Sequence, residues 1–181
     1  SFKETLDEIR KRVKEVLDKL EKILRDIARR VEKVNKENED RLREINRRNE
    51  EVLRRLKKKG VDETLLERNR RANERTNREV KKSNDETREV LKEAKKAIEK
   101  LLEELRRVLK EVEDRADKKR DDEDKLRELL ERLERLLREL ERRVEKIEED
   151  LKRILDEVRK RTKELLERNE RILEKLERDA D

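Results

Sequence analysis

The sequence predicts an all-α protein, an elongated up-down-up antiparallel three-helix bundle with nearly straight helices of about 53 to 57 residues, forming one domain over 1–181. Charged residues make up 61% of the chain, and Leu, Ile and Val recur among them at helical spacing from Phe2 to Leu176. The single glycine and the absence of proline leave few places where a helix would end. Regular apolar spacing argues against disorder, which the high charge content would otherwise suggest.

The first helix is predicted over residues 2–58, followed by a loop over 59–62. Gly60 can adopt the left-handed conformation that ends a helix, and Val61 can then fold back onto the last turn. Asp62 is a preferred residue type for the N-cap of a second helix. Local sequence therefore specifies a tight first turn.

The second helix is predicted over 63–115 and the third over 123–179, with a loop over 116–122 between them. This loop has no glycine or proline, but it also has no large apolar residue. We expect Asp121 or Asp122 to cap the third helix, because carboxylates favour the positive end of the helix dipole.

Core positions in the first and third helices advance at the period of a straight α-helix. The predicted core positions of the first helix are 2, 6, 9, 13, 16, 20, 23, 27, 31, 34, 38, 42, 45, 49, 52 and 56. Those of the third are 126, 129, 133, 136, 140, 144, 147, 151, 154, 158, 162, 165, 169, 172, 176 and 180. Each set advances 54 residues in 15 steps, an average of 3.6, whereas a left-handed coiled coil keeps about 3.5.

Amides and hydroxyls interrupt the apolar pattern at core-spaced positions. The candidate hydrogen-bond network comprises Asn35, Asn38, Asn46, Asn49, Asn69, Asn73, Thr76, Ser83, Asn84, Thr87, Thr162 and Asn169. Buried amides are tolerated when they bond to one another, and such layers fix helix register. The alternative is that the polar side chains of this region are exposed to solvent, above all Asn84 and the neighbouring Asn77, which is not in the candidate network.

Folding the chain about the two loops brings polar residues from different helices to common heights. With the first loop centred near residue 60, Asn49 faces the segment 69–73, Asn46 faces 73–77, and Asn35 and Asn38 face 83–84. With the second loop centred near residue 119, Asn69 faces Asn169 and Thr76 faces Thr162. These coincidences favour interhelical layers over scattered surface amides.

In these features the whole chain resembles de novo designed helical bundles with buried hydrogen-bond networks. The resemblance rests on the dominance of Glu, Arg, Lys and Leu, the Gly60-Val61-Asp62 turn, the absence of His, Cys, Met and Trp, and the polar layers. It implies a role as a scaffold, an oligomer or a heterodimer module. The second loop departs from the usual pattern because it has no helix-ending glycine.

Residue types needed for catalysis and ligand binding are scarce. No histidine can serve as a base for the two serines, Ser1 and Ser83, and no core position carries a carboxylate that could hold a metal. We expect no enzyme activity, no cofactor, no metal and no small-molecule substrate.

Apolar runs are too short for a membrane span or signal peptide, so a soluble protein is expected. The net charge of +6 comes with interleaved signs and a single aromatic residue, so no nucleic-acid partner is expected.

Two functional hypotheses remain from the sequence. In the first, the chain is a monomeric designed scaffold of no natural biochemical activity that requires no partner. In the second, it is an interaction module that self-associates or binds a designed helical partner. The second hypothesis is motivated by the middle of the second helix, 69–87, where Ala72 and Val80 are almost the only apolar core residues.

Overall fold

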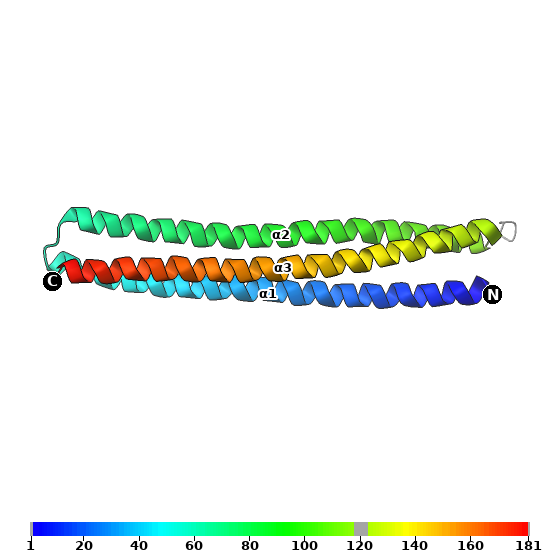
Figure 1. Ribbon diagram of the computed structural model, residues 1–181, viewed down its shortest axis with the longest axis horizontal. Helices are drawn as coiled ribbons and strands as arrows, with labels where there is room; N and C mark the ends of the chain where they lie inside the picture. The colour runs from blue at the N-terminus through cyan, green and yellow to red at the C-terminus, as the bar shows by residue number, and fades with distance from the viewer. Residues whose placement is uncertain (1, 118–122, 181) are drawn as a thin grey trace. The chain divides into compact units, whose positions relative to one another are not determined.

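The computed structural model describes residues 2–117 and 123–180, and within these ranges the chain is helical except around Gly60. In chain order the helices are α1 (Phe2–Lys58), α2 (Glu63–Asp117) and α3 (Glu123–Ala180), which Figure 1 labels. They contain 57, 55 and 58 residues, and each pair of helices shares side-chain contacts. The predicted all-α three-helix bundle is confirmed.

Two helix ends differ from the predicted boundaries. The second helix continues to Asp117 instead of ending at residue 115, since the sequence there offers no glycine or proline to stop it. The third helix begins at Glu123 as predicted and extends to Ala180, one residue further than predicted. The remainder of the predicted loop, 118–122, including its two candidate N-caps Asp121 and Asp122, lies outside the described residues.

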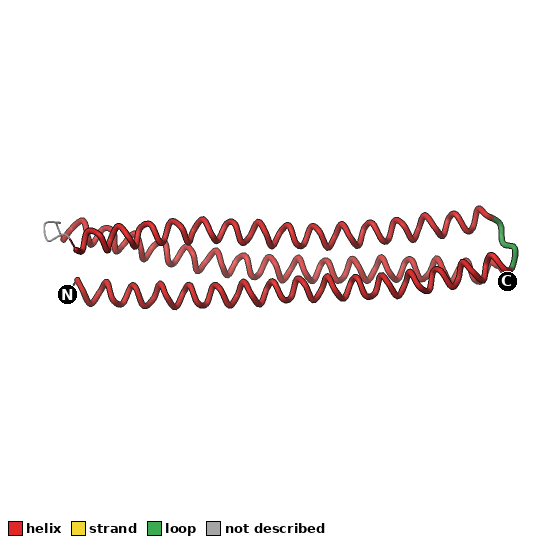
Figure 2. Tube along the Cα trace, turned by 180° about the vertical axis from the view of Figure 1, so that it is seen from behind, coloured by secondary structure: helices red, strands yellow, loops and turns green. Residues whose placement is uncertain are grey.

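The turn after α1 has the hydrogen bonds of a Schellman motif, with Gly60 in the left-handed region at φ 69°. Gly60 N donates to Lys57 O at 3.2 Å, and Val61 N donates to Leu56 O at 3.2 Å. These bonds satisfy carbonyls that the end of α1 leaves without intrahelical partners. Figure 2 shows this turn as the loop beside the C-terminal end of α3. The predicted helix stop at Gly60 is confirmed.

Asp62 caps the start of α2, as predicted. Its Oδ1 accepts a hydrogen bond from Thr64 N at 3.4 Å, and its carbonyl accepts one from Leu65 N at 3.1 Å. Val61 and Leu66, on either side of this cap, both pack against the apolar cluster beneath the turn. This arrangement fixes where the chain enters α2.

Contacts divide the chain into two compact units. Unit 1 consists of Ser1–Ala28 with Val90–Leu151, and unit 2 of Arg29–Glu89 with Lys152–Asp181. Each helix contributes a segment to each unit. The expectation of one domain over 1–181 and that of nearly straight helices stay predictions.

Unit 1 has an aliphatic core drawn from all three helices. Its largest fully buried side chains include Ile9 of α1, Leu105 of α2 and Leu133 of α3. The buried cluster of this unit contains fifteen residues, all of them Leu, Ile or Val. Among the residues that the structure describes, unit 1 buries no polar side chain.

Unit 2 combines a smaller aliphatic cluster with polar residues. The cluster contains seven buried residues, with Leu56, Val80 and Leu173 supplied by α1, α2 and α3 respectively. In this unit α1 and α3 run in the same direction, because ion pairs join Glu37 to Arg159 and, further along both helices, Arg55 to Glu177. The unit therefore has the up-down-up arrangement that was predicted.

The helical periodicity identified the buried faces of α1 and α3. Every predicted core position whose side chain is described is buried or half-buried, and those of Phe2 and Leu126 lie outside the description. No large hydrophobic side chain in the described ranges is exposed. The large apolar residues whose side chains are described are therefore buried or half-buried within the chain itself.

Candidate functional site

The candidate site is the polar core of unit 2, to which all twelve predicted network residues belong. Ten of them are buried: Asn35, Asn38, Asn49, Asn69, Thr76, Ser83, Asn84, Thr87, Thr162 and Asn169. Asn46 and Asn73 are half-buried. A buried polar side chain needs a hydrogen-bond partner to offset its desolvation, so the bonds of each residue decide what the site does.

Two amide pairs join α1 to α2 in the interior. Asn38 Nδ2 donates to Asn84 Oδ1 at 3.2 Å, and Asn69 Nδ2 donates to Asn49 Oδ1 at 2.5 Å. All four side chains are at most 3% exposed. Asn84, one of the residues for which solvent exposure was the alternative, is therefore a buried partner.

A third pair between these helices, Asn46 with Asn77, is half-buried and reciprocal. Each Nδ2 donates to the other side chain's Oδ1 at 2.9 Å, and Asn77 Nδ2 also donates to Asn73 O at 2.7 Å. Asn77 was left out of the predicted network. The helix register already indicated that Asn77 belongs to the network, because Asn46 was expected to face the segment 73–77.

Asn169 connects α3 to the network through a different residue from the one expected. Its Nδ2 donates to Asn73 Oδ1 at 3.4 Å, whereas the register predicted Asn69, one helical turn away. One physical reason is the position of the second turn. With α2 ending at residue 117 and α3 beginning at 123, the midpoint is residue 120 and not 119, which moves the residue facing Asn169 from 69 to 71 and so accounts for half of the observed displacement to Asn73.

Two of the threonines bond within their own helix and do not join helices. Thr76 Oγ1 donates to Ala72 O at 2.9 Å, and Thr87 Oγ1 donates to Ser83 O at 2.8 Å. A threonine hydroxyl in a helix readily reaches the carbonyl four residues earlier, which competes with an interhelical bond. The expected pairing of Thr76 with Thr162 is therefore not made through hydroxyls.

Several buried polar atoms of the site have no hydrogen-bond partner in the described part of the chain. They are Asn35 Nδ2, Asn35 Oδ1, Asn69 Oδ1, Ser83 Oγ, Thr162 Oγ1 and Asn169 Oδ1. Each such atom costs about 1 to 3 kcal/mol if it stays unsatisfied. Two of the six atoms, Thr162 Oγ1 and Asn169 Oδ1, belong to α3, and the other four belong to α1 and α2.

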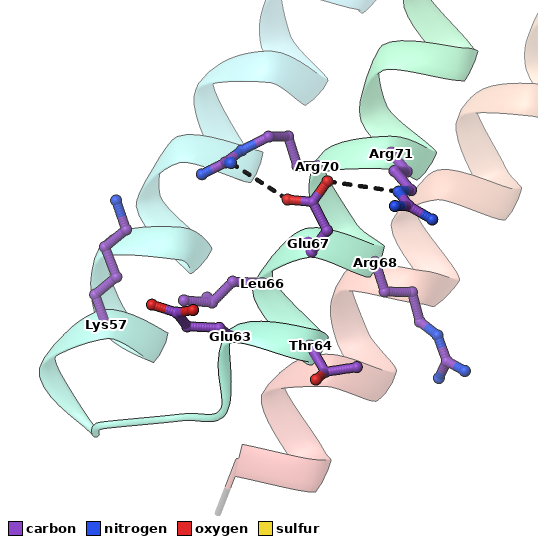
Figure 3. Close-up of a pocket in the computed structure, with 8 residues that line it drawn as sticks. All are labelled: Lys57, Glu63, Thr64, Leu66, Glu67, Arg68, Arg70 and Arg71. Carbon is purple, nitrogen blue, oxygen red and sulfur yellow. Dashed lines mark hydrogen bonds and ion pairs between the residues drawn. The ribbon is translucent and has the colours of Figure 1, made fainter.

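A surface depression of about 830 Å³ lies next to the Gly60 turn. Figure 3 shows that its lining comes from α2, with Lys57 added from α1. Glu67 forms ion pairs with Arg70 at 3.3 Å and with Arg71 at 3.4 Å, and all three side chains are about half exposed or more. The depression is a solvated charged surface without a buried polar group.

Within residues 2–117 and 123–180 there is no group of three acidic, histidine or cysteine side chains arranged to hold a metal ion. No helix in the same ranges combines the length and apolar character of a membrane span. Comparisons of the chain with protein families, with curated protein sequences and with solved structures found no match.

Proposed function

We propose that this chain is a non-enzymatic structural scaffold, a helical bundle that covers its own core and uses polar layers to align its helices. The first support is that every large hydrophobic residue whose side chain is described is buried or half-buried. Exposed apolar patches mark surfaces that bind other macromolecules, and this surface is covered by charge instead.

The observation that carries the proposal is the set of direct amide bonds between α1 and α2. Asn38 with Asn84, Asn46 with Asn77, and Asn49 with Asn69 pair three levels of the same two helices. A slip of one helical turn moves a side chain by about 5.4 Å, which breaks all three bonds together. Leucines would pack in either register, so the amides supply alignment more than stability.

The proposal is tested first by molecular mass in solution. Light scattering at micromolar concentration is expected to give the mass of one chain, 22.4 kDa. A stable dimer or larger assembly would contradict a self-sufficient scaffold, because the chain would then need another copy to complete its structure.

The alignment role is tested by spin labels at two exposed positions of unit 2, introduced by Lys33→Cys and Glu86→Cys in a chain that has no native cysteine. The distance distribution between the labels is expected to be narrow with the native amides. Replacing the six paired asparagines by leucine should broaden or split it while the chain stays helical. An unchanged narrow distribution would show that aliphatic packing alone sets the register.

A second candidate function is an interaction module whose polar layers pair with a helix of another chain. It is favoured by the buried atoms without partners, such as those of Asn35 and Ser83, which a foreign polar residue could satisfy. If the partner is a second copy of this chain, the mass measurement distinguishes the two candidate functions, because an interaction module would then give a dimer or larger assembly. If the partner is a different chain, we propose that it is an amphipathic helix with polar residues on its buried face, and candidate helices of this kind should be screened for binding. Enzyme activity and binding to nucleic acid or a membrane are not proposed.

We also infer a designed origin. Supporting it are the lack of seven residue types (Pro, Cys, His, Met, Trp, Tyr and Gln), the Gly60 turn with its matched caps, and polar residues concentrated at corresponding levels. A natural sequence of this length would ordinarily use most of these residue types.

A further inference from the structure

One level of the polar core of unit 2 contains buried groups that the chain does not satisfy. Asn35 of α1 is 0% exposed, and both its amide nitrogen and its amide oxygen have no partner in the described part of the chain. Ser83 of α2 is 3% exposed and its hydroxyl has none either. Buried polar atoms without hydrogen-bond partners are destabilising, so these three atoms need a partner from outside the chain.

The heights of these groups follow from a neighbouring bond, which fixes the register of α1 against α2. Asn38 bonds to Asn84, and the helices are antiparallel, so Asn35 lies about one turn further along α2, near Thr87. Thr87 and Ser83 are themselves joined, since Thr87 Oγ1 donates to Ser83 O at 2.8 Å. Asn35 therefore lies level with Thr87, at one end of the turn of α2 that carries both hydroxyls, and Ser83 lies about 6 Å further along at the other end.

The third helix provides no buried polar side chain at the height of Asn35, whereas Thr162, whose hydroxyl also has no partner in the described part of the chain, lies about level with Ser83. Arg159 of α3 pairs with Glu37 of α1 at 3.7 Å, so the residues of α3 level with Asn35 are centred near 157. The inward-facing residues there are Leu155 and Val158, which are 5% and 9% exposed. Neither side chain has an atom that donates or accepts a hydrogen bond.

The hydrogen-bonding character of the atoms without partners indicates which kind of ligand could satisfy them. The Asn35 nitrogen needs an acceptor, the Asn35 oxygen needs a donor, and the Ser83 hydroxyl can act as either. A cation would satisfy only the oxygens, an anion only the nitrogen and hydroxyl, and an apolar molecule none of them. Water donates two hydrogen bonds and accepts two, and buried water typically bonds to about three such groups.

We propose that the level of Asn35, Ser83 and Thr87 is an internal hydration site that holds an ordered water molecule bridging α1 and α2. The site goes beyond the scaffold function, because it depends on the burial and hydrogen bonding of these residues and not on what the protein is for. It makes solvent a structural component of unit 2 at the level where the α1–α2 amide pairs end.

The test is ¹⁷O relaxation dispersion of water, which counts long-lived internal water and is not affected by exchange of hydroxyl protons. The full chain and its Asn35→Leu variant are compared, with circular dichroism to establish that the variant folds. The variant is expected to lose the contribution of one water molecule. The matched control Asn38→Leu with Asn84→Leu removes a directly bonded pair and should leave the dispersion amplitude unchanged.

Equal amplitudes in the native chain and Asn35→Leu would overturn the proposal. Should Asn35→Leu fail to fold, a high-resolution crystal structure of the native chain decides the question. Water density within hydrogen-bond distance of both Asn35 and an α2 hydroxyl supports the site. A direct bond from Asn35 to Ser83 with no water between them refutes it.

Discussion

The buried pair of Asn38 and Asn84 allows the energetic role of the polar core to be measured. Both side chains are 3% exposed or less, and Asn38 Nδ2 donates to Asn84 Oδ1 at 3.2 Å. Replacing either residue by leucine leaves one buried amide without its bond, at a cost of about 1 to 3 kcal/mol. Replacing both removes the orphaned amide, since two leucines of similar size pack against each other.

We therefore expect the double variant Asn38→Leu, Asn84→Leu to be more stable than either single variant by about 1 to 3 kcal/mol. In a chain of this size each kcal/mol corresponds to about 2 to 4 °C in Tm. Guanidinium unfolding followed by circular dichroism at 222 nm gives the four free energies of the cycle.

The control combines Asn38→Leu with Asn69→Leu. Asn69 bonds to Asn49, and it lies 15 residues from Asn84 on α2, a distance of about 22 Å. Sites this far apart should be additive within about 0.5 kcal/mol. Additivity of the Asn38 and Asn84 substitutions as well would refute the view that this bond couples the two helices.

Three further outcomes follow from other parts of the molecule. Gly60→Ala should lower the free energy of unfolding by about 1 to 2 kcal/mol, because φ is 69° and an added Cβ meets no atom within 4 Å, so the whole cost is backbone strain; Gly60→Asn, in the same assay, should lose less. Arg10→Gln should change stability by less than about 1 kcal/mol although Arg10 pairs with Glu113 at 3.0 Å, since both side chains are more than a third exposed; a larger loss in guanidinium unfolding would contradict this. Hydrogen exchange in α2 should be slower over 98–112, which packs in the aliphatic core of unit 1, than over 69–87, which carries the polar core of unit 2; equal rates would show that the amides protect as well as the aliphatic residues.

The sequence by itself determined the helices and their buried faces. Apolar spacing averaging 3.6 residues identified the core of α1 and α3, and Gly60 with Asp62 determined the first turn through backbone chemistry that acts within a few residues. The second turn was placed less well. Without glycine or proline, nothing local stops α2 at residue 115, and it continues to Asp117.

Only the tertiary structure decided how the polar residues are bonded. Asn169 bonds to Asn73 and not to Asn69, a displacement of one helical turn, of which a one-residue shift in the midpoint of the second turn accounts for two residues; no local pattern encodes so small a shift. Thr76 and Thr87 could bond across helices or back along their own, and the packing around each hydroxyl selects the second option. Spacing along the sequence shows which side chains face inward, whereas hydrogen bonds depend on differences of about 1 Å between helices, which are set by packing.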